Sequence, residues 1–499
     1  MTVEAVERAE FVISQEEPKK VVAETEKAVE EVKQMDYSKP QIVQKSSSYR
    51  EESNFLSDLK EFEKKALNEL KAKLEEAILG NTLFKKDEPK KNEKEKPEVE
   101  EKEKESETKK GEEEAGKIEE VKPKGEEKEN EPKESDEEKK PQVALEEKSI
   151  EVDKDISIWG VSLLPSKGAE GTDMVLLKFL RAREFKVNDA FEMLKKTLQW
   201  RKEANIDSIL GEEFASDLSS VAYMNGVDRE GHPVCYNIFG VFENEELYTK
   251  TFGTEENRGQ FLRWRFQLME KGIQKLDMRP GGVTSLLQIN DLKNSPGVSK
   301  KDLRVSMKQA VGLLQDNYPE FVARNIFINA PFWYYALNAL LSPFLTQRTK
   351  SKFVIAHPAK VTETLLKYIS AEEIPVQYGG FKRENDFEFS KADDPVSELT
   401  VKAGSTETIE IPAAEVGSTL VWDLTVLNWE VIYKEEFVPS DEGSYTIIVQ
   451  KDKKMGYNEG PIRNTFRNNE TGKIVLTIVN SSNKKKRALY RYMIKNCLH

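Results

Sequence analysis

Residues 85–149 constrain the fold of this chain of 499 residues more than any other segment does. The tract consists mainly of Lys, Glu and Pro and contains almost no aromatic or large aliphatic side chain. Such a composition buries too little apolar area to offset the entropy that is lost on ordering. We therefore predict that this tract is disordered and that the main folded part of the chain follows it, after residue 150.

Charge distinguishes the same two parts of the chain. Residues 1–150 contain 31 Lys and Arg against 43 Asp and Glu, whereas the remaining residues contain 46 against 47. The net charge of −13 at pH 7 therefore resides almost entirely in the N-terminal region, and the folded part is nearly neutral. The isoelectric point of the whole chain consequently says nothing about the partners of the folded part.

Cysteine content and hydropathy indicate the compartment. The two cysteines, Cys235 and Cys497, provide neither a disulfide framework nor a zinc site, which is typical of a reducing compartment. The N-terminus lacks the basic and apolar regions of a signal peptide. Because no apolar run approaches the roughly 20 residues of a membrane span, we expect a cytoplasmic protein that associates with membranes only peripherally.

One segment of the acidic region, near residues 53–80, follows a helical period. Apolar side chains recur every three or four positions from Phe55 to Ile78, with Ser53 or Asn54 as a possible N-terminal cap and Gly80 at the end. We predict an amphipathic helix within an otherwise mostly disordered tail that spans residues 1–150. Its mixed acidic and basic polar face favours a protein partner over a lipid surface.

The rest of the chain divides into three regions. Residues 151–210 contain two amphipathic helical patterns, which predict a helical hairpin that caps another domain. Residues 211–391 alternate strand and helix patterns, which is typical of an α/β sheet. Residues 395–499 contain successive strand patterns that are separated by turns and not by helices, which predicts a β-sandwich.

One helical pattern in the α/β region is unusually apolar. It follows Ala330-Pro331, and the aromatic residues at its beginning widen the apolar stripe beyond the needs of one packed face. Its apolar positions are Phe332, Trp333, Leu337, Leu340, Leu341, Phe344 and Leu345. A loop with Arg348, Lys350 and Lys352 comes next. This pairing suits a ligand with an acyl tail and a phosphate, and a buried core helix beside a solvated loop is the alternative.

Catalysis is not indicated by the residues that usually perform it. The three histidines are His232 in a turn, His357 at the end of a strand and His499 at the last position. A phosphatase loop that began at Cys235 would need Arg at the place of Val241. Walker loops, GxGxxG motifs and Cys/His clusters with metal-ligand spacing are missing from the sequence. We therefore predict a protein without enzymatic activity, metal or cofactor.

A basic cluster near the C-terminus permits three interpretations. It consists of Lys484, Lys485, Lys486 and Arg487. A solvated edge that blunts strand pairing is the first interpretation. Attraction to anionic phospholipid headgroups, worth about 1 kcal/mol per cation, is the second. Nucleic-acid binding is disfavoured because no aromatic stacking platform accompanies the cluster.

Several motifs resemble known families. The segment LLKFLRAREFKVNDAFEMLKKTLQWRKE resembles the helical cap of CRAL-TRIO lipid-binding proteins. Five further motifs resemble parts of the CRAL-TRIO domain itself: DREGHPV, INDLKN, DNYPE, INAPF and IPVQYGG. A following region that looks like a GOLD β-sandwich, behind an acidic Lys/Glu tail, is similar to the architecture of the plant patellins. The resemblance implies an α/β CRAL-TRIO domain with an N-terminal helical cap, followed by an all-β GOLD sandwich.

The resemblance also implies a site. One lipid would occupy a pocket in the α/β domain, with the apolar helix from Phe332 to Leu345 as a mobile gate. In members that bind phosphatidylinositol, the headgroup is held by an Arg of the cap, a Glu after Tyr-Pro, and a Thr and a Lys after the gate. The matching residues are Arg183, Glu320, Thr349 and Lys352. Alternatively, Arg183 and Glu320 form a salt bridge that fixes the cap to the sheet.

Two positions depart from the family pattern. Glu184 follows Arg183 where the family often has a second cation, which weakens the expected phosphate site. Leu286 and Gln288 replace a Ser-x-Thr pair of members that also hold phosphatidylcholine, so exchange of that lipid is not expected.

The expected function is therefore a carrier or sensor of phosphoinositides without enzymatic activity. It would bind a phospholipid and no other cofactor, and would contact anionic membranes through the gate helix and the basic residues Arg348, Lys350, Lys484, Lys485, Lys486 and Arg487. The resemblance to patellins implies membrane trafficking, including cell-plate formation in cytokinesis, with protein partners at the GOLD domain and the acidic tail. The alternative is an interaction scaffold whose pocket is vestigial or holds a hydrophobe without phosphate. A third interpretation, a carrier of a tocopherol or a retinoid, ranks lower because it would not need Arg183 and Lys352.

Overall fold

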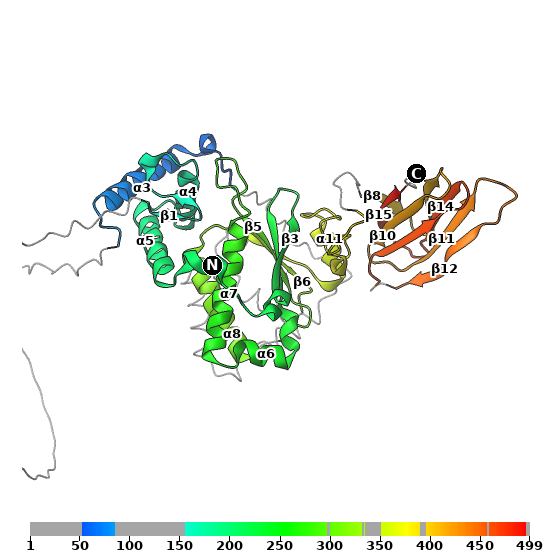
Figure 1. Ribbon diagram of the computed structural model, residues 1–499. Coiled ribbons are helices and arrows are strands. Elements are labelled where there is room, and N and C mark those ends of the chain that lie inside the picture. Colours follow the sequence, from blue (N-terminus) through cyan, green and yellow to red (C-terminus); the bar gives the residue numbers. More distant parts are fainter. Residues whose placement is uncertain are drawn as a thin grey trace, which may run out of the picture. The chain divides into compact units, whose positions relative to one another are not determined.

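The computed structural model describes residues 52–84, 155–296, 300–331, 334, 351–389, 396–456 and 459–495 (Figure 1). The tract 85–149, which we predicted to be disordered, lies outside the described residues. The three folded regions are those that the sequence predicted: a helical cap, an α/β domain and an all-β sandwich.

The cap contains three long helices. They are α3 (Glu61–Leu79), α4 (Thr172–Ala182) and α5 (Val187–Glu203), and α3 packs against both of the others. The 3-10 helices η1 (Leu56–Asp58) and η2 (Pro165–Lys167) and a two-stranded ribbon of β1 (Ser157–Ile158) and β2 (Val161–Ser162) complete it. Helix α3 has its apolar stripe on one side and buries it in the shared core of the cap.

The place of α3 corrects our prediction for the acidic region. The apolar face of α3 is covered by α4 and α5 of the same chain, so it needs no partner protein. The cap therefore includes α3, which lies before the predicted boundary at residue 151. The helix begins at Glu61, so Ser53 and Asn54 do not cap it. Instead, Asn54 donates hydrogen bonds to the Gly282 carbonyl and the Thr284 hydroxyl, each at 3.1 Å. The residues before α3 therefore tie the cap to the α/β domain.

Two central leucines of α3 provide a test of this arrangement. Leu70 and Leu74 are both 0% exposed. We expect Leu70→Ala with Leu74→Ala to destabilise the cap by about 4 kcal/mol or more, because each buried Leu→Ala substitution costs about 2–5 kcal/mol. Hydrogen exchange of α4 and α5 would measure this loss, with the exposed pair Asn68→Ala and Glu69→Ala as the control. Wild-type exchange rates in the leucine variant would show that α3 is not part of the cap.

The α/β domain is built on a five-stranded sheet with the order β3-β4-β5-β6-β7. β3 is antiparallel to β4, and the other pairs are parallel. The strands are β3 (Ala222–Val227), β4 (Pro233–Ile238), β5 (Leu286–Asp291), β6 (Val322–Ile328) and β7 (Phe353–Ile355). The helices are α6 (Glu245–Phe252), α7 (Glu255–Ile273), α8 (Lys301–Asn317) and α11 (Val361–Leu365). The short 3-10 helices are η3 (Ile206–Gly211), η4 (Ser216–Ser220), η5 (Phe239–Glu243), η7 (Pro358–Lys360) and η8 (Val376–Tyr378).

The two faces of this sheet have different neighbours, because successive side chains of a strand point to opposite faces. On one face, Tyr236 and Ile289 form a core with Leu365 and with residues that follow α11. On the other face, Leu286 packs against Phe266 and other apolar residues of α7. The second face also carries Asn237, Gln288 and Asn290 of β4 and β5, which are unusual residues for the interior of a sheet.

The C-terminal region is a sandwich of two four-stranded antiparallel sheets, as the sequence predicted. Their orders are β13-β10-β15-β8 and β12-β11-β14-β9. The strands are β8 (Ser397–Val401), β9 (Thr406–Ala413), β10 (Thr419–Val426), β11 (Val431–Pro439), β12 (Ile447–Met455), β13 (Ile462–Arg467), β14 (Gly472–Val479) and β15 (Lys486–Lys495). Trp422, Trp429, Tyr433 and Phe437 fill the space between the sheets.

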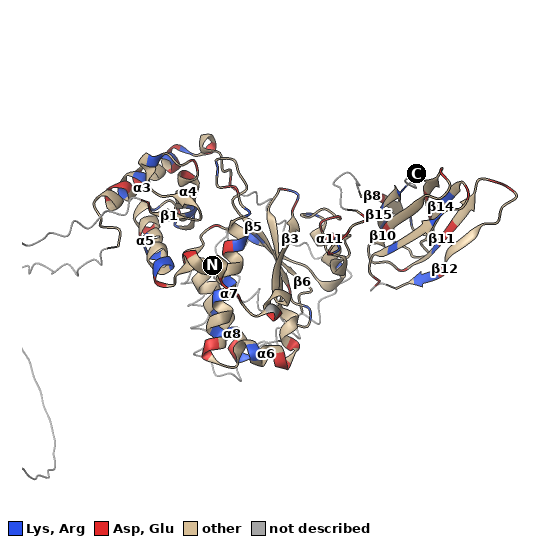
Figure 2. Cartoon of the chain, in the orientation of Figure 1, with Lys and Arg blue, Asp and Glu red and all other residues tan. Residues whose placement is uncertain are grey.

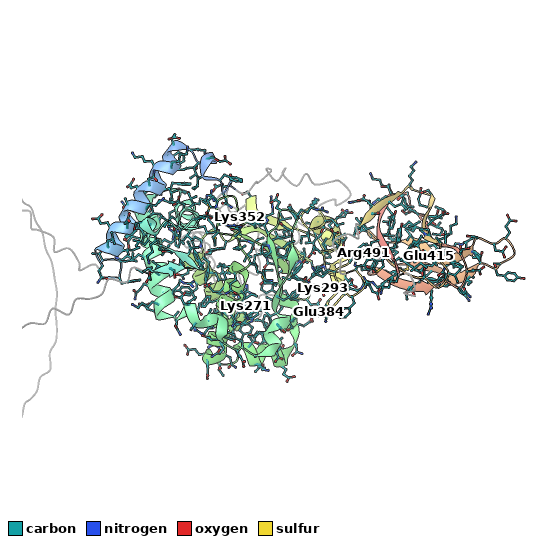
Figure 3. The ribbon with its side chains drawn as sticks, turned by 45° about the horizontal axis from the view of Figure 1, so that its top comes forward. Lys271, Lys293, Lys352, Glu384, Glu415 and Arg491 are labelled. Atoms are coloured by element: carbon teal, nitrogen blue, oxygen red, sulfur yellow. The ribbon has the colours of Figure 1, made fainter. Side chains whose placement is uncertain are left out.

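A buried ionic cluster connects the sandwich to the segment that follows η8. Asp423 of β10 is 0% exposed and accepts hydrogen bonds from Arg463 of β13 and from Arg491 of β15, which is labelled in Figure 3. Arg383, which follows η8, donates to the same carboxylate at 2.8 Å. Asp386 of that segment accepts from Arg463 at 2.7 and 2.8 Å. The segment is thus held to the sandwich by the charges of Arg383 and Asp386.

Candidate lipid-binding site

The structure brings two of the four predicted headgroup residues together. Lys352, which is labelled in Figure 3, has its Nζ 2.8 Å from Glu320 Oε2 and donates a second hydrogen bond to the Val322 carbonyl at 3.0 Å. Glu320 comes just before β6 and Lys352 just before β7, and these strands are parallel neighbours, so their first residues meet at one edge of the sheet. The side chains are only 17% and 14% exposed. A partly buried ion pair thus occupies the predicted site.

The backbone at Glu320 is held by the cap. Glu320 has a φ of 56°, a left-handed conformation that is uncommon for residues other than glycine. Lys178 of α4 donates to its carbonyl at 2.9 Å and to the Thr284 carbonyl at 2.7 Å. The same ammonium lies 4.1 Å from the centroid of the Phe321 ring. Sequence reasoning missed Lys178, although a lysine within the apolar run LLKFL is a signal of a buried, partnered cation.

Arg183 lies at the C-terminal end of α4 and is half-buried. Its Nη1 donates to the Ala182 carbonyl at 3.3 Å, and its charge opposes the rise that burial causes in the pKa of Asp316. Within the described part of the chain, Arg183 forms no ion pair with Glu320, which pairs with Lys352 instead. The alternative of an Arg183–Glu320 salt bridge is therefore not found. Glu184, the first departure from the family pattern, is exposed beside it.

The remaining predicted site residues cannot be placed. Thr349, the gate residues Phe332, Trp333, Leu337, Leu340, Leu341, Phe344 and Leu345, and the loop cations Arg348 and Lys350 lie outside the described residues. Their roles stay predictions.

An apolar sheet surface adjoins the Glu320–Lys352 pair. Phe327 and Ile355 are register partners on β6 and β7, and Phe353 follows Lys352 directly. The Phe327 ring lies 5.6 Å from that of Phe353 and 5.1 Å from that of Tyr334. The three strand residues are only partly buried, although the sheet interior around them is apolar. A charged pair beside an apolar surface provides the two environments that a phospholipid requires.

Neither a metal site nor an activated nucleophile is needed to explain the other reactive side chains. Asp228, Glu230 and His232 are the group of possible metal ligands among the described residues. The turn between β3 and β4 accounts for it, because Asp228 Oδ1 accepts from the backbone N–H groups of Glu230 and His232 while Oδ2 lies 2.9 Å from His232 Nδ1. Burial raises the pKa of the Cys235 thiol to about 11, so this thiol is not an activated nucleophile.

The structure divides the predicted basic cluster at the C-terminus. Lys486 is buried and pairs with Glu430 at 3.1 Å, and Arg487 forms two hydrogen bonds of 2.7 Å with Glu398. Lys486 is therefore not exposed to a membrane, whereas the Arg487 side chain remains 42% exposed and its membrane role stays a prediction. Lys484 and Lys485 are exposed.

Sequence reasoning missed a second exposed basic segment, on β12. Lys451, Lys453 and Lys454 of this edge strand are exposed, and Figure 2 shows blue, the colour of Lys and Arg, along β12. Ile447 and Ile448 at the beginning of the strand are 37% and 58% exposed. The signal was available in the sequence IIVQKDKKM, where apolar residues lead directly into lysines. Among the helices of the described residues, we find no segment that is long and apolar enough to span a membrane.

Comparison with known proteins follows the same division into domains. A CRAL/TRIO N-terminal domain model matches residues 66–196, a CRAL/TRIO domain model matches residues 218–380, and a model of the Patellin-1-like C-terminal GOLD domain matches residues 402–486. The first match begins within α3, which agrees with the place of this helix in the cap.

Curated relatives match this chain over different shares of its length. Patellin-4 of Arabidopsis thaliana is 61% identical over 529 aligned residues, which cover 98% of this chain and 96% of that protein. Patellin-3 of the same plant is 50% identical and covers 68% of this chain and 70% of its own length. A phosphatidylinositol transfer protein of Kluyveromyces lactis is 28% identical over 49% of this chain and 80% of its own length.

Proposed function

This chain belongs to the patellin family, and from that membership we propose that it is a carrier or sensor of phosphatidylinositol or phosphoinositides that has no enzymatic activity. One lipid would bind in the CRAL-TRIO domain, with its headgroup at Arg183, Glu320, Thr349 and Lys352. The observation that supports this most is the partly buried Glu320–Lys352 pair at the edge of an incompletely covered apolar sheet surface. The yeast relative that is named a phosphatidylinositol transfer protein agrees with the ligand class.

The pair would act by exchanging partners. In the structure, the Lys352 ammonium is held by Glu320 and by the Val322 carbonyl. A phosphate that enters would accept a charge-assisted hydrogen bond from Lys352 and another from Arg183. The Glu320 carboxylate would then accept hydrogen bonds from inositol hydroxyls. Because the ion pair satisfies both groups without ligand, the empty site would avoid an uncompensated buried charge.

Membrane contact is the second part of the proposal. Exposed cations of the sandwich, at Lys484, Lys485 and on β12, would attract an anionic membrane surface by about 1 kcal/mol each. We place the protein in the cytoplasm as a peripheral membrane protein in trafficking, with the cell plate of dividing cells as one site of action. A fluorescent fusion that never reaches the cell plate would contradict that site. Protein partners would use the GOLD domain and the acidic tail.

The loading of the full chain with lipid tests the proposal. We expect protein that has been incubated with phosphatidylinositol vesicles, and then separated from them, to carry one inositol phospholipid per chain in native mass spectrometry. We also expect it to sediment with phosphatidylcholine vesicles only when these contain phosphatidylserine. A protein that stays empty would contradict the carrier function and favour the scaffold, while sedimentation that is independent of phosphatidylserine would contradict the contact through cations.

A further inference from the structure

Arg265 of α7 is a cation inside the CRAL-TRIO domain without a carboxylate partner. Its Nη1 donates to Asn237 Oδ1 at 2.8 Å, and its guanidinium carbon lies 5.6 Å from the centroid of the Trp264 ring. Among the residues that the structure describes, no Asp or Glu pairs with it. By contrast, Arg263 of the same helix pairs with Glu212. A buried charge that lacks a counter-charge costs several kcal/mol, so the exception at Arg265 requires an explanation.

The hydrogen bonds of Arg265 fix the orientation of the amides around it. An arginine can only donate, so Asn237 must turn its oxygen toward Arg265 and its nitrogen away. The Asn237 nitrogen donates to Gln288 Oε1 at 2.8 Å and to Asn290 Oδ1 at 3.3 Å. Gln288 and Asn290 are therefore left with their amide nitrogens directed away from Asn237. Arg265 thus fixes the direction of the hydrogen bonds in the whole group, and the unused groups are the donor amide nitrogens of Gln288 and Asn290.

Arg265 has unused donors of its own. Its Nε is enclosed by protein and has no hydrogen-bond partner in the described ranges, and Nη2 donates no hydrogen bond there either. Because Nε is enclosed, Nη2 is the donor that remains for an oxygen of a carboxylate or phosphate, beside the Nη1 that holds Asn237. Burial lowers the pKa of Arg265, and the residue still keeps an intermediate accessible surface.

The group lies on the sheet face that carries the apolar surface. Asn237 and Asn290 are register partners on β4 and β5, and the same register continues to Phe327 on β6 and Ile355 on β7. An acyl chain on Phe327 and Ile355 could therefore place a polar group on β4 and β5. The Glu320–Lys352 pair lies before the first residues of β6 and β7, whereas Asn237 and Asn290 lie toward the ends of β4 and β5, so Arg265 is apart from that pair along the sheet.

We propose that Arg265, Asn237, Gln288 and Asn290 form a second subsite that binds the oxyanion of an anionic amphiphile, a carboxylate or a phosphate on an acyl chain. The oxyanion supplies the counter-charge that Arg265 lacks and accepts from its Nη2 and from the amide nitrogens. The subsite rests on the proposed function in one respect, since it uses the same lipid cavity. It extends the ligand range from inositol lipids to simpler anionic lipids.

Binding of matched anionic and neutral probes to the full chain tests the subsite. The probes are oleate with oleyl alcohol, and dioleoyl phosphatidate with dioleoylglycerol, in displacement of a fluorescent fatty acid. We expect the wild type to bind at least one anionic probe roughly tenfold or more tightly than its neutral counterpart, since about 1.4 kcal/mol corresponds to a factor of ten. A preference for oleate identifies a carboxylate as the ligand group, and a preference for phosphatidate identifies a phosphate.

Three variants make the test specific. Arg265→Gln should lose this preference, whereas Lys271→Gln, which removes the same charge from an exposed position on the same helix, should keep it (Figure 3). Arg265→Lys keeps the charge without the fork and should lose most of the preference, which decides the question if the Gln variant does not fold. Anionic preference in Arg265→Gln, or none in the wild type, would overturn the subsite.

Failure of the Arg265 subsite can be distinguished from failure of the proposed phosphatidylinositol function. Arg265→Gln should still load phosphatidylinositol, because the Glu320–Lys352 pair is intact. If the wild type loads no phosphatidylinositol and yet binds oleate in an Arg265-dependent way, the headgroup assignment fails and the subsite stands. If it loads phosphatidylinositol and ignores charge in the other probes, the subsite fails alone.

Discussion

Replacing Arg183 and Lys352 together by alanine is expected to abolish phosphatidylinositol loading. Each charge-assisted hydrogen bond contributes about 1.5–3 kcal/mol, so the loss of two amounts to about 3 kcal/mol or more. That corresponds to roughly a hundredfold weaker binding. Native mass spectrometry of the full chain after incubation with phosphatidylinositol vesicles would measure the bound lipid. Loading at the wild-type level would contradict the assignment of the headgroup site.

The control for this double variant must address Glu320. Without Lys352, the Glu320 carboxylate is left partly buried without its ion-pair partner, which destabilises the domain independently of lipid. Lys352→Met combined with Glu320→Gln removes both charges, and it should fold and still fail to load. Lys186→Ala with Lys367→Ala removes two positive charges from exposed positions and should load normally. A loss of loading in the exposed pair would mean that net charge, and not the site, determines uptake.

Apolar runs and helical periods predicted the central elements of the α/β domain. The sequence predicts strands at 233–239, 283–290, 325–329 and 353–356 and helices at about 255–276 and 301–317, and the structure contains β4 to β7, α7 and α8 close to these positions. In the sandwich, the sequence predicts no strand between 451 and 473, and β13 was missed because its sequence IRNTFR is mostly polar: Arg463 points to the buried carboxylate of Asp423 and not to solvent. A polar residue in such an edge strand can be interpreted only once its partner on another strand is known.

Long-range contacts explain the other failures. The apolar stripe of α3 packs against α4 and α5, which follow the tract 85–149 in the sequence. The stripe alone therefore could not show which surface it packs against. Lys486 was assigned to an exposed patch because its neighbours in sequence are basic, but its partner Glu430 comes from another part of the sandwich. Glu320 and Lys352 could be named from the motifs that they follow. The roles of Lys178 and Arg265 depend on carbonyls and amides that only the fold assembles.

Asp423 is expected to be the most sensitive single residue of the sandwich. Its carboxylate is fully buried and accepts hydrogen bonds from Arg383, Arg463 and Arg491. In Asp423→Asn, Asp386 is the carboxylate of this cluster that remains for these arginines. Removing one partner from a buried ionic group costs about 3–5 kcal/mol. We expect hydrogen exchange of β10, β13 and β15 to accelerate accordingly. Asp452→Asn, at an exposed position of β12, is the matched control, and equal exchange in both variants would contradict the role of the cluster.

The same cluster predicts how the stability of the sandwich depends on pH. Hydrogen bonds from Arg463 lower the pKa of Asp386 from 3.8 to about 2. A carboxyl with a lowered folded-state pKa stabilises fully above its unfolded pKa and loses this contribution as the pH falls through the folded value. About 2 kcal/mol should therefore disappear between roughly pH 4 and pH 2. In Asp386→Asn this part of the pH profile should be flat, since no proton is then taken up at this position. A parallel decline in both proteins would show that other carboxyls control the acid unfolding and that Arg463 stabilises the sandwich through Asp423 alone.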